Sequence, residues 1–118
     1  MKKICLIAAL LVLPAPSFHA SQPLAVEAPT VMLAPGDLVL RTLIEPDAAN
    51  SAIQITIDSS EFYRRSEMSL HGGSAPRSSA FEYRDLPRGR YEIHAVLLDA
   101  NGEPRASIVR ALNVVARN

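Results

Sequence analysis

A strict alternation of apolar and polar residues in one segment restricts the fold of this chain more than any other feature. Ile53, Ile55 and Ile57 occupy every second position, and polar residues fill the positions between them. Side chains of a β-strand alternate between the two faces of a sheet, so the isoleucines would share one face. On a helix they would not share one stripe. The pattern predicts a half-buried strand over 53–58.

The same alternation recurs along the chain between segments rich in Gly, Pro, Asn and Asp. We expect further strands at 38–45, 68–70, 81–84, 91–97 and about 105–115. Residues 21–36 carry three prolines, which block ladder hydrogen bonds and favour a linker that leads into an irregular edge strand. Residues 59–66 are expected to be a polar connection. Six or seven short strands without an amphipathic helix predict an all-β sandwich or barrel.

The N-terminus has the pattern of a secretory signal peptide. Lys2 and Lys3 precede ten consecutive apolar residues, Ile4 to Leu13, and small residues follow. Ten helical residues rise about 15 Å, half of a hydrocarbon core of about 30 Å, so we expect no stable membrane anchor. We expect a signal peptide over 1–20, cleaved between 17 and 22 with a cut after Ala20 slightly favoured, and a periplasmic or secreted protein.

The expected mature chain consists of a flexible proline-containing lead-in, 21–29, and one β-sandwich domain, 30–116. Beyond residue 20 it has no Cys and no Lys, since Cys5, Lys2 and Lys3 lie in the signal, and its formal charge is 10 − 12 = −2. A disulfide is therefore excluded. The absence of a basic excess argues against a nucleic-acid partner.

Residues 81–93 read Phe-Glu-Tyr-Arg-Asp-Leu-Pro-Arg-Gly-Arg-Tyr-Glu-Ile, and Leu-Leu-Asp-Ala-Asn-Gly follows at 97–102. This stretch resembles the C-terminal half of bacterial immunoglobulin-like and fibronectin type III-like modules. Its Leu-Pro-x-Gly-x-Tyr corner, formed by Leu86, Pro87, Gly89 and Tyr91, is similar to that of collagen-adhesin B-type and carboxypeptidase-regulatory-like domains. The resemblance implies a Greek-key sandwich of about seven strands and is unspecific for function.

In such a corner, Tyr91 would bury its ring and return its hydroxyl to the backbone upstream, which fixes a crossover between the sheets. The chain departs from better-known members of this group. It has no Trp and no Cys pair, which excludes an antibody-type core, and no lysine beyond the signal for a Lys–Asn isopeptide bond.

The candidate binding surface comprises Phe62, Tyr63, Arg64 and Arg65. Aromatic and arginine side chains recur at recognition sites because they bury area and still form hydrogen bonds. Such a surface would suit a sugar ring or the edge of a peptide. In the alternative, Phe62 belongs to the core and the two arginines pair with nearby acids.

Other candidate sites have weaker patterns. His71 and His94 could form a soft copper site with Met32 and Met68, but no His-x-His or His-x-Met cluster is present. A hydrolase could use Ser66 or Ser69 with a histidine and Asp99, but the sequence has no nucleophile elbow. The carboxylates near turns do not follow the alternating pattern of a Ca²⁺ loop; they are Glu45, Asp47 and Asp58.

We therefore expect no catalytic residue, no cofactor and no metal. The leading expectation is a non-catalytic exported binding or accessory module that contacts another exported or envelope protein. A carbohydrate-binding or small-ligand-binding sandwich is the first alternative, and a copper-handling periplasmic sandwich is the second. The sequence does not indicate an oligomeric state.

Overall fold

The computed structural model describes residues 22–117, so the expected signal peptide lies outside the described residues. Eight strands form in this range, with one short 3₁₀ helix, η1 (Gly72–Ser74). The strands are β1 (Leu24–Glu27), β2 (Val31–Ala34), β3 (Gly36–Ile44), β4 (Ala52–Asp58), β5 (Tyr63–Ser69), β6 (Ser78–Leu86), β7 (Gly89–Leu98) and β8 (Pro104–Ala116).

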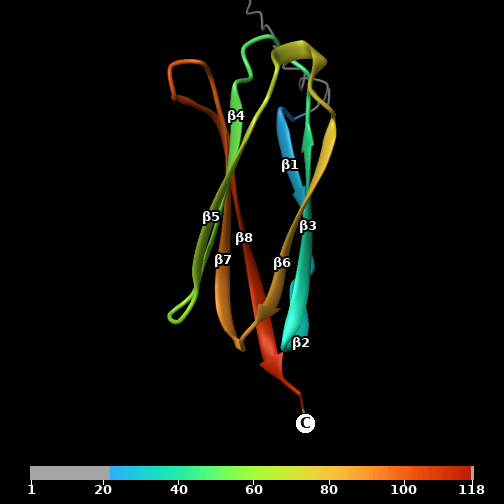
Figure 1. Cartoon of the computed structure of the whole chain (residues 1–118), viewed down its shortest axis with the longest axis vertical. Helices are drawn as coiled ribbons and strands as arrows, with labels where there is room; N and C mark the ends of the chain where they lie inside the picture. Colours follow the sequence, from blue (N-terminus) through green and yellow to red (C-terminus); the bar gives the residue numbers. More distant parts are fainter. Residues whose placement is uncertain (1–21, 118) are drawn as a thin grey trace, which may run out of the picture.

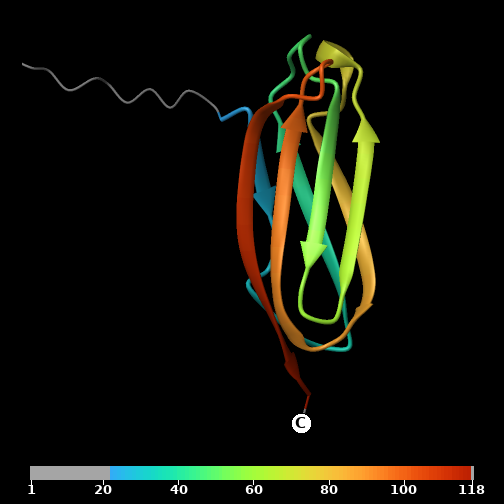
Figure 2. The ribbon, with the colours of Figure 1, turned by 90° about the vertical axis from the view of Figure 1, so that its left-hand side faces the viewer.

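The strands form two sheets packed face to face, which confirms the all-β sandwich (Figure 1). One sheet has the order β1-β3-β6, and the other has the order β2-β8-β7-β4-β5 (Figure 2). All neighbours are antiparallel except β2, which runs parallel to the end of β8. The arrangement is compatible with an immunoglobulin-like fold. No helix among the described residues is long and apolar enough to cross a membrane.

The core lies between the sheets and is built by the alternating residues of the expected strands. Ile53, Ile55 and Ile57 of β4 are fully buried, as the period-two pattern predicts. They pack in one cluster with the inward residues of β3, β7 and β8. On β3 the buried residues are Leu38, Leu40, Thr42 and Ile44.

The proline-containing segment 21–36 contributes two strands rather than one irregular strand. β1 pairs with β3, and β2 pairs with β8, so the chain changes sheets between them. Pro29 lies in the connection between β1 and β2, outside both ladders. Its lack of a backbone N–H group therefore removes no ladder hydrogen bond. Leu24 and Val26 of β1 are buried in the core. The expected flexible lead-in, 21–29, therefore supplies a packed strand in this structure.

The expected polar connection over 59–66 is too long. The connection ends at Phe62, and β5 begins at Tyr63. The reason is that β5 is an edge strand with few apolar residues, of which only Met68 packs against the core. A strand that buries so little of its surface lacks the apolar alternation from which strands are predicted.

The corner of 86–91 carries the chain from β6 in one sheet to β7 in the other. Leu86 and Tyr91 are buried, and Gly89 has a φ of +152°, which favours glycine. The Tyr91 hydroxyl donates a hydrogen bond to the Pro87 carbonyl oxygen. The contact expected for Tyr91 is therefore present, and it ties the first residues of β7 to the crossover.

Candidate functional site

β5 is an edge strand, because it pairs with β4 on one side and with no other strand of the described chain. The Leu70 amide donates to the Ser51 carbonyl, and the Ser59 amide donates to the Phe62 carbonyl, each at 2.8 Å. Bonded and non-bonded positions alternate along an antiparallel pair. Even-numbered residues of β5 therefore direct their backbone groups at β4. The backbone groups that point away from the sheet belong to Tyr63, Arg65, Glu67 and Ser69.

The four residues of the expected binding surface divide between the two sides of this edge. Phe62 is half-buried, and its ring meets Tyr91 edge-on at a centroid distance of 5.9 Å. The Arg64 guanidinium lies 5.7 Å from the centroid of the Phe62 ring. Tyr63 and Arg65 lie on the outward face, and Tyr63 is 62% exposed. Neither arginine forms an ion pair with a described residue.

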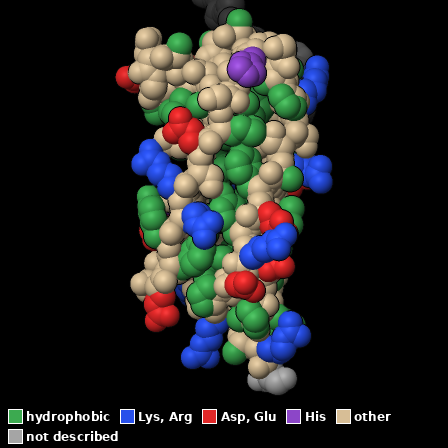
Figure 3. Space-filling model, in the orientation of Figure 1, with side chains coloured by type: hydrophobic (Ala, Val, Ile, Leu, Met, Phe, Trp, Pro, Cys, Tyr) green, Lys and Arg blue, Asp and Glu red, His purple; other side chains and the backbone are tan. Residues whose placement is uncertain are grey.

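Behind β5, a hydrogen bond connects the edge strands of the two sheets. The Tyr83 hydroxyl on β6 donates to the Ser66 Oγ at 3.0 Å. Burial raises the pKa of Tyr83, while the Ser66 hydrogen bond and the Arg64 charge act in the opposite direction. The space-filling view of this side shows hydrophobic side chains between charged ones (Figure 3). This side therefore offers apolar, charged and backbone groups to a partner.

The outward face of the five-stranded sheet continues the surface from Tyr63. Tyr63 lies opposite Asp58 in the register, and Asp58 lies opposite Glu92 of β7. Glu92 and His94 approach each other at 2.9 Å between Oε1 and Nε2. A hollow of about 360 Å³ lies here, lined by Asp58, Arg90, Tyr91, Glu92 and Ala111. Its carboxylates, Asp58 and Glu92, can accept hydrogen bonds from the hydroxyl groups of a small polar ligand, and Arg90 can donate them.

A larger hollow, of about 410 Å³, lies on the other sheet and is unrelated to the candidate segment. It is lined by Gln22, Ala25, Leu43, Ile44, Glu45 and Arg77. None of these residues forms a salt bridge among the described residues. We assign it no role.

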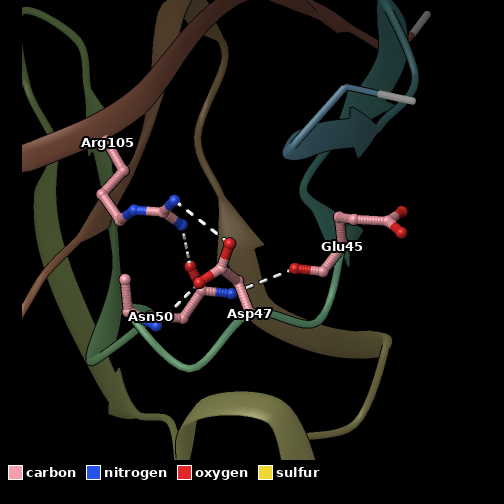
Figure 4. A network of polar contacts seen from close by, with 5 residues as sticks. Glu45, Asp47, Asn50 and Arg105 are labelled. Atoms are coloured by element: carbon pink, nitrogen blue, oxygen red, sulfur yellow. Dashed lines mark hydrogen bonds and ion pairs between the residues drawn. The ribbon is translucent and has the colours of Figure 1, made fainter. Parts of the chain in front are cut away.

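A polar network around the buried side chain of Asn50 holds the connection between β3 and β4 (Figure 4). Asn50 is 3% exposed; its Nδ2 donates to the Glu45 carbonyl at 3.0 Å, and its Oδ1 accepts from Nη1 of Arg105 on β8. Nη2 of Arg105 donates to Asp47 at 3.3 Å. The Ala49 amide and the Arg105 charge lower the pKa of Asp47. Asp47, a candidate Ca²⁺ ligand by its position near a turn, thus holds this connection in place.

The sulfur and imidazole groups of the copper alternative do not come together. Met32 and Met68 lie on the two opposite edge strands of the same sheet, and both pack against the core. His71 precedes η1, whereas His94 lies in the middle of β7. Residues 22–117 contain no group of three His, Cys, Asp or Glu side chains that could hold a metal ion.

Of the hydrolase alternative, Ser66 is likewise separate from His94. Ser66 faces inward, bonded to Tyr83, whereas His94 lies on the opposite, outward face of the same sheet. Oδ1 of Asp99 accepts hydrogen bonds from the backbone amides of Asn101 and Glu103 in the turn between β7 and β8. These contacts orient the turn.

No protein-family model matches this chain, and no curated protein matches it. Among solved structures, the chain is similar to the sulfur carrier protein SoxY from Chlorobium limicola f thiosulfatophilum, with a TM-score of 0.58, 14% identity and 80% of each chain covered. It is also similar to part of a family 76 glycoside hydrolase from a bovine Bacteroides thetaiotaomicron strain. There the TM-score is 0.54, the identity is 14%, and the match covers 77% of this chain and 20% of the hydrolase. At 14% identity, both similarities show a shared fold alone.

Proposed function

We propose that this chain is an exported, non-catalytic module that binds another protein through the edge strand β5. The observation that supports the proposal most strongly is the outward row of backbone groups on Tyr63, Arg65, Glu67 and Ser69. An extended segment of a partner adds to such an edge by main-chain hydrogen bonds, and side chains beside the edge supply specificity. Tyr63 and Arg65 are exposed and belong to residue types favoured at interfaces.

The other sheet edges are less suited to this role. β2 covers β8 only over Asn113–Ala116, so the earlier residues of β8 form a further open edge, which begins with Pro104 beside a register shift in the β7–β8 ladder. β1 and β2 are four residues each, and prolines precede and follow them. The β3–β6 ladder has a register shift near its end, and Asp85 there has a φ of 57°. β5 is seven residues long, contains no Pro, and keeps its register with β4 throughout. Its charged residues, Arg64, Arg65 and Glu67, are of both signs and can pair with a strand of complementary charge. Short, bulged or proline-flanked edges are those that resist pairing.

Two parts of the proposal, export and membership of the immunoglobulin or fibronectin III group, rest mainly on the sequence. Export is supported by Lys2, Lys3 and the apolar run that follows. Membership of the immunoglobulin or fibronectin III group is supported by the corner and its Tyr91 hydrogen bond. A periplasmic or secreted protein without lysine or cysteine in its mature part would bind its partner without a disulfide or a lysine-derived crosslink.

A carbohydrate-binding module is the second candidate. It is favoured by the exposed ring of Tyr63, which lies opposite Asp58, a residue that lines the hollow of about 360 Å³. Aromatic side chains stack on sugar rings, and carboxylates accept hydrogen bonds from sugar hydroxyl groups. Soluble oligosaccharides that compete with the protein partner would favour this candidate.

In-cell photocrosslinking tests the protein-binding function. A photoreactive residue replaces Arg65 on the β5 edge, and a matched chain carries it at Arg110 on β8, in the part of the opposite edge of the same sheet that β2 does not cover. We expect a protein adduct from position 65 that is absent from position 110. Equal labelling at both positions, or adducts from position 110 alone, would overturn the assignment of the β5 edge.

A further inference from the structure

We propose that the partner of β5 is β5 of a second copy of this chain, paired antiparallel about a two-fold axis at Ser66. The inference rests on the proposed function, because it uses the same edge. It identifies the partner and fixes the register. The two five-stranded sheets would join into one continuous sheet, with each edge covered by the other.

The backbone limits the registers that two copies can adopt. Outward amides and carbonyls belong to the odd-numbered residues of β5, so odd residues must face odd residues of the other copy. In a two-fold antiparallel pair this requires the axis to pass through a residue rather than between two. An axis at Ser66 overlaps all seven residues of both strands, whereas any other axis leaves part of β5 unpaired.

The charges select among these registers. With the axis at Ser66, Arg65 lies opposite Glu67 of the second copy, and Glu67 lies opposite its Arg65. An axis at Arg65 would place two arginines face to face, and an axis at Glu67 would do the same with two glutamates. Opposite charges across a strand pair stabilise it, and like charges destabilise it. Only the Ser66 register combines full overlap with two ion pairs.

The side chains involved are available for this pairing. Arg65 and Glu67 are exposed on the outward face and form no ion pair within residues 22–117. Glu67 accepts a hydrogen bond from Gln54 of the neighbouring strand β4 at 3.1 Å, through one of its two carboxylate oxygens. Arg64 lies on the inner side over Phe62 and would face Met68 of the second copy, so it meets no like charge.

Sedimentation velocity on the full chain tests the pairing by charge reversal. We expect a wild-type dimer, and for Arg65→Glu and for Glu67→Arg a dissociation constant raised about tenfold or more, since both ion pairs become repulsive. An equimolar mixture of the two variants should recover the dimer, because every contact across the axis is then complementary. The matched control, Arg110→Glu, should behave as wild type. Variants that dimerise normally, or a mixture that stays monomeric, would overturn the proposal.

Disulfide trapping tests the register itself. At a non-hydrogen-bonded pair the two Cα atoms lie about 4.5 Å apart, within disulfide reach. We therefore expect Ser66→Cys to give a covalent dimer under mild oxidation. Ser69→Cys should not, since its two copies would lie about 20 Å apart along the strands. Efficient trapping through Ser69→Cys instead would contradict the register.

The failure of this inference is distinguishable from the failure of the proposed function. A monomeric wild type whose Arg65 photoprobe captures a different protein would overturn self-pairing and leave the binding function in place. A monomer with no adduct from position 65 would overturn both. A dimer that is insensitive to both charge reversals would place self-association elsewhere on the molecule.

Discussion

Replacement of Asn50 by alanine should destabilise the fold, because this buried residue forms hydrogen bonds through both ends of its amide group. The substitution removes the hydrogen bond to the Glu45 carbonyl and the charge-assisted bond from Arg105. A neutral hydrogen bond contributes about 1 kcal/mol, and one to a charged group about 1.5–3 kcal/mol. Asp47 still holds Arg105 from the other side. We therefore expect a loss of about 2–4 kcal/mol in the free energy of unfolding.

Urea unfolding at pH 7, followed by far-ultraviolet circular dichroism, measures this loss. In a domain of this size each kcal/mol lowers Tm by about 4–8 °C, so thermal unfolding gives an independent check. The control is Asn101→Ala, an exposed residue of the β7–β8 turn whose backbone amide, not its side chain, bonds Asp99. If the free energy of unfolding of Asn50→Ala lay within about 0.5 kcal/mol of the wild-type value, as expected for the control, the reasoning would be refuted.

Three further outcomes are expected. Tyr91→Phe should lower the free energy of unfolding by about 1 kcal/mol in urea, since the Pro87 carbonyl loses its donor; no loss would mean that this contact does not stabilise the corner. Burial raises the pKa of Tyr83 and Tyr91, so their neutral forms stabilise the fold below pH about 10 and this stability is lost as the pH rises through the raised pKa values. Urea unfolding across alkaline pH should show that loss, and Tyr91→Phe should reduce it; a flat profile would contradict the raised values. Asp85→Gly should raise Tm, because glycine adopts the φ of 57° without strain; a lowered Tm would contradict the strain assigned to this residue.

The central strands could be predicted from the sequence because each buries one full face. The isoleucines of β4 lie between two paired neighbours, so their period-two pattern reports directly on burial. The turn at Asn101-Gly102 was equally predictable. Gly102 has a φ of 78°, and glycine adopts such a positive φ more readily than other residues. Such features depend on local residues alone.

The edges and the long-range contacts could not be predicted in this way. β5 packs only Met68 against the core and therefore lacks a clear apolar pattern. The bond between Asn50 and Arg105 spans 55 positions, and the bond between Ser66 and Tyr83 joins two sheets. No local pattern signals either contact. The sequence indicated Tyr63 and Arg65 as surface candidates, but their outward backbone groups follow only from the pairing of β5 with β4.

Native mass spectrometry of the exported chain, purified gently from its own compartment, tests the central claim most directly. One spectrum gives the cleavage site, the stoichiometry and any bound mass. We expect a chain cut between 17 and 22, present in a complex that contains a second protein chain and no metal or sugar. A single chain that carries the mass of a copper ion or a saccharide, without any protein-containing complex, would contradict the protein-binding function.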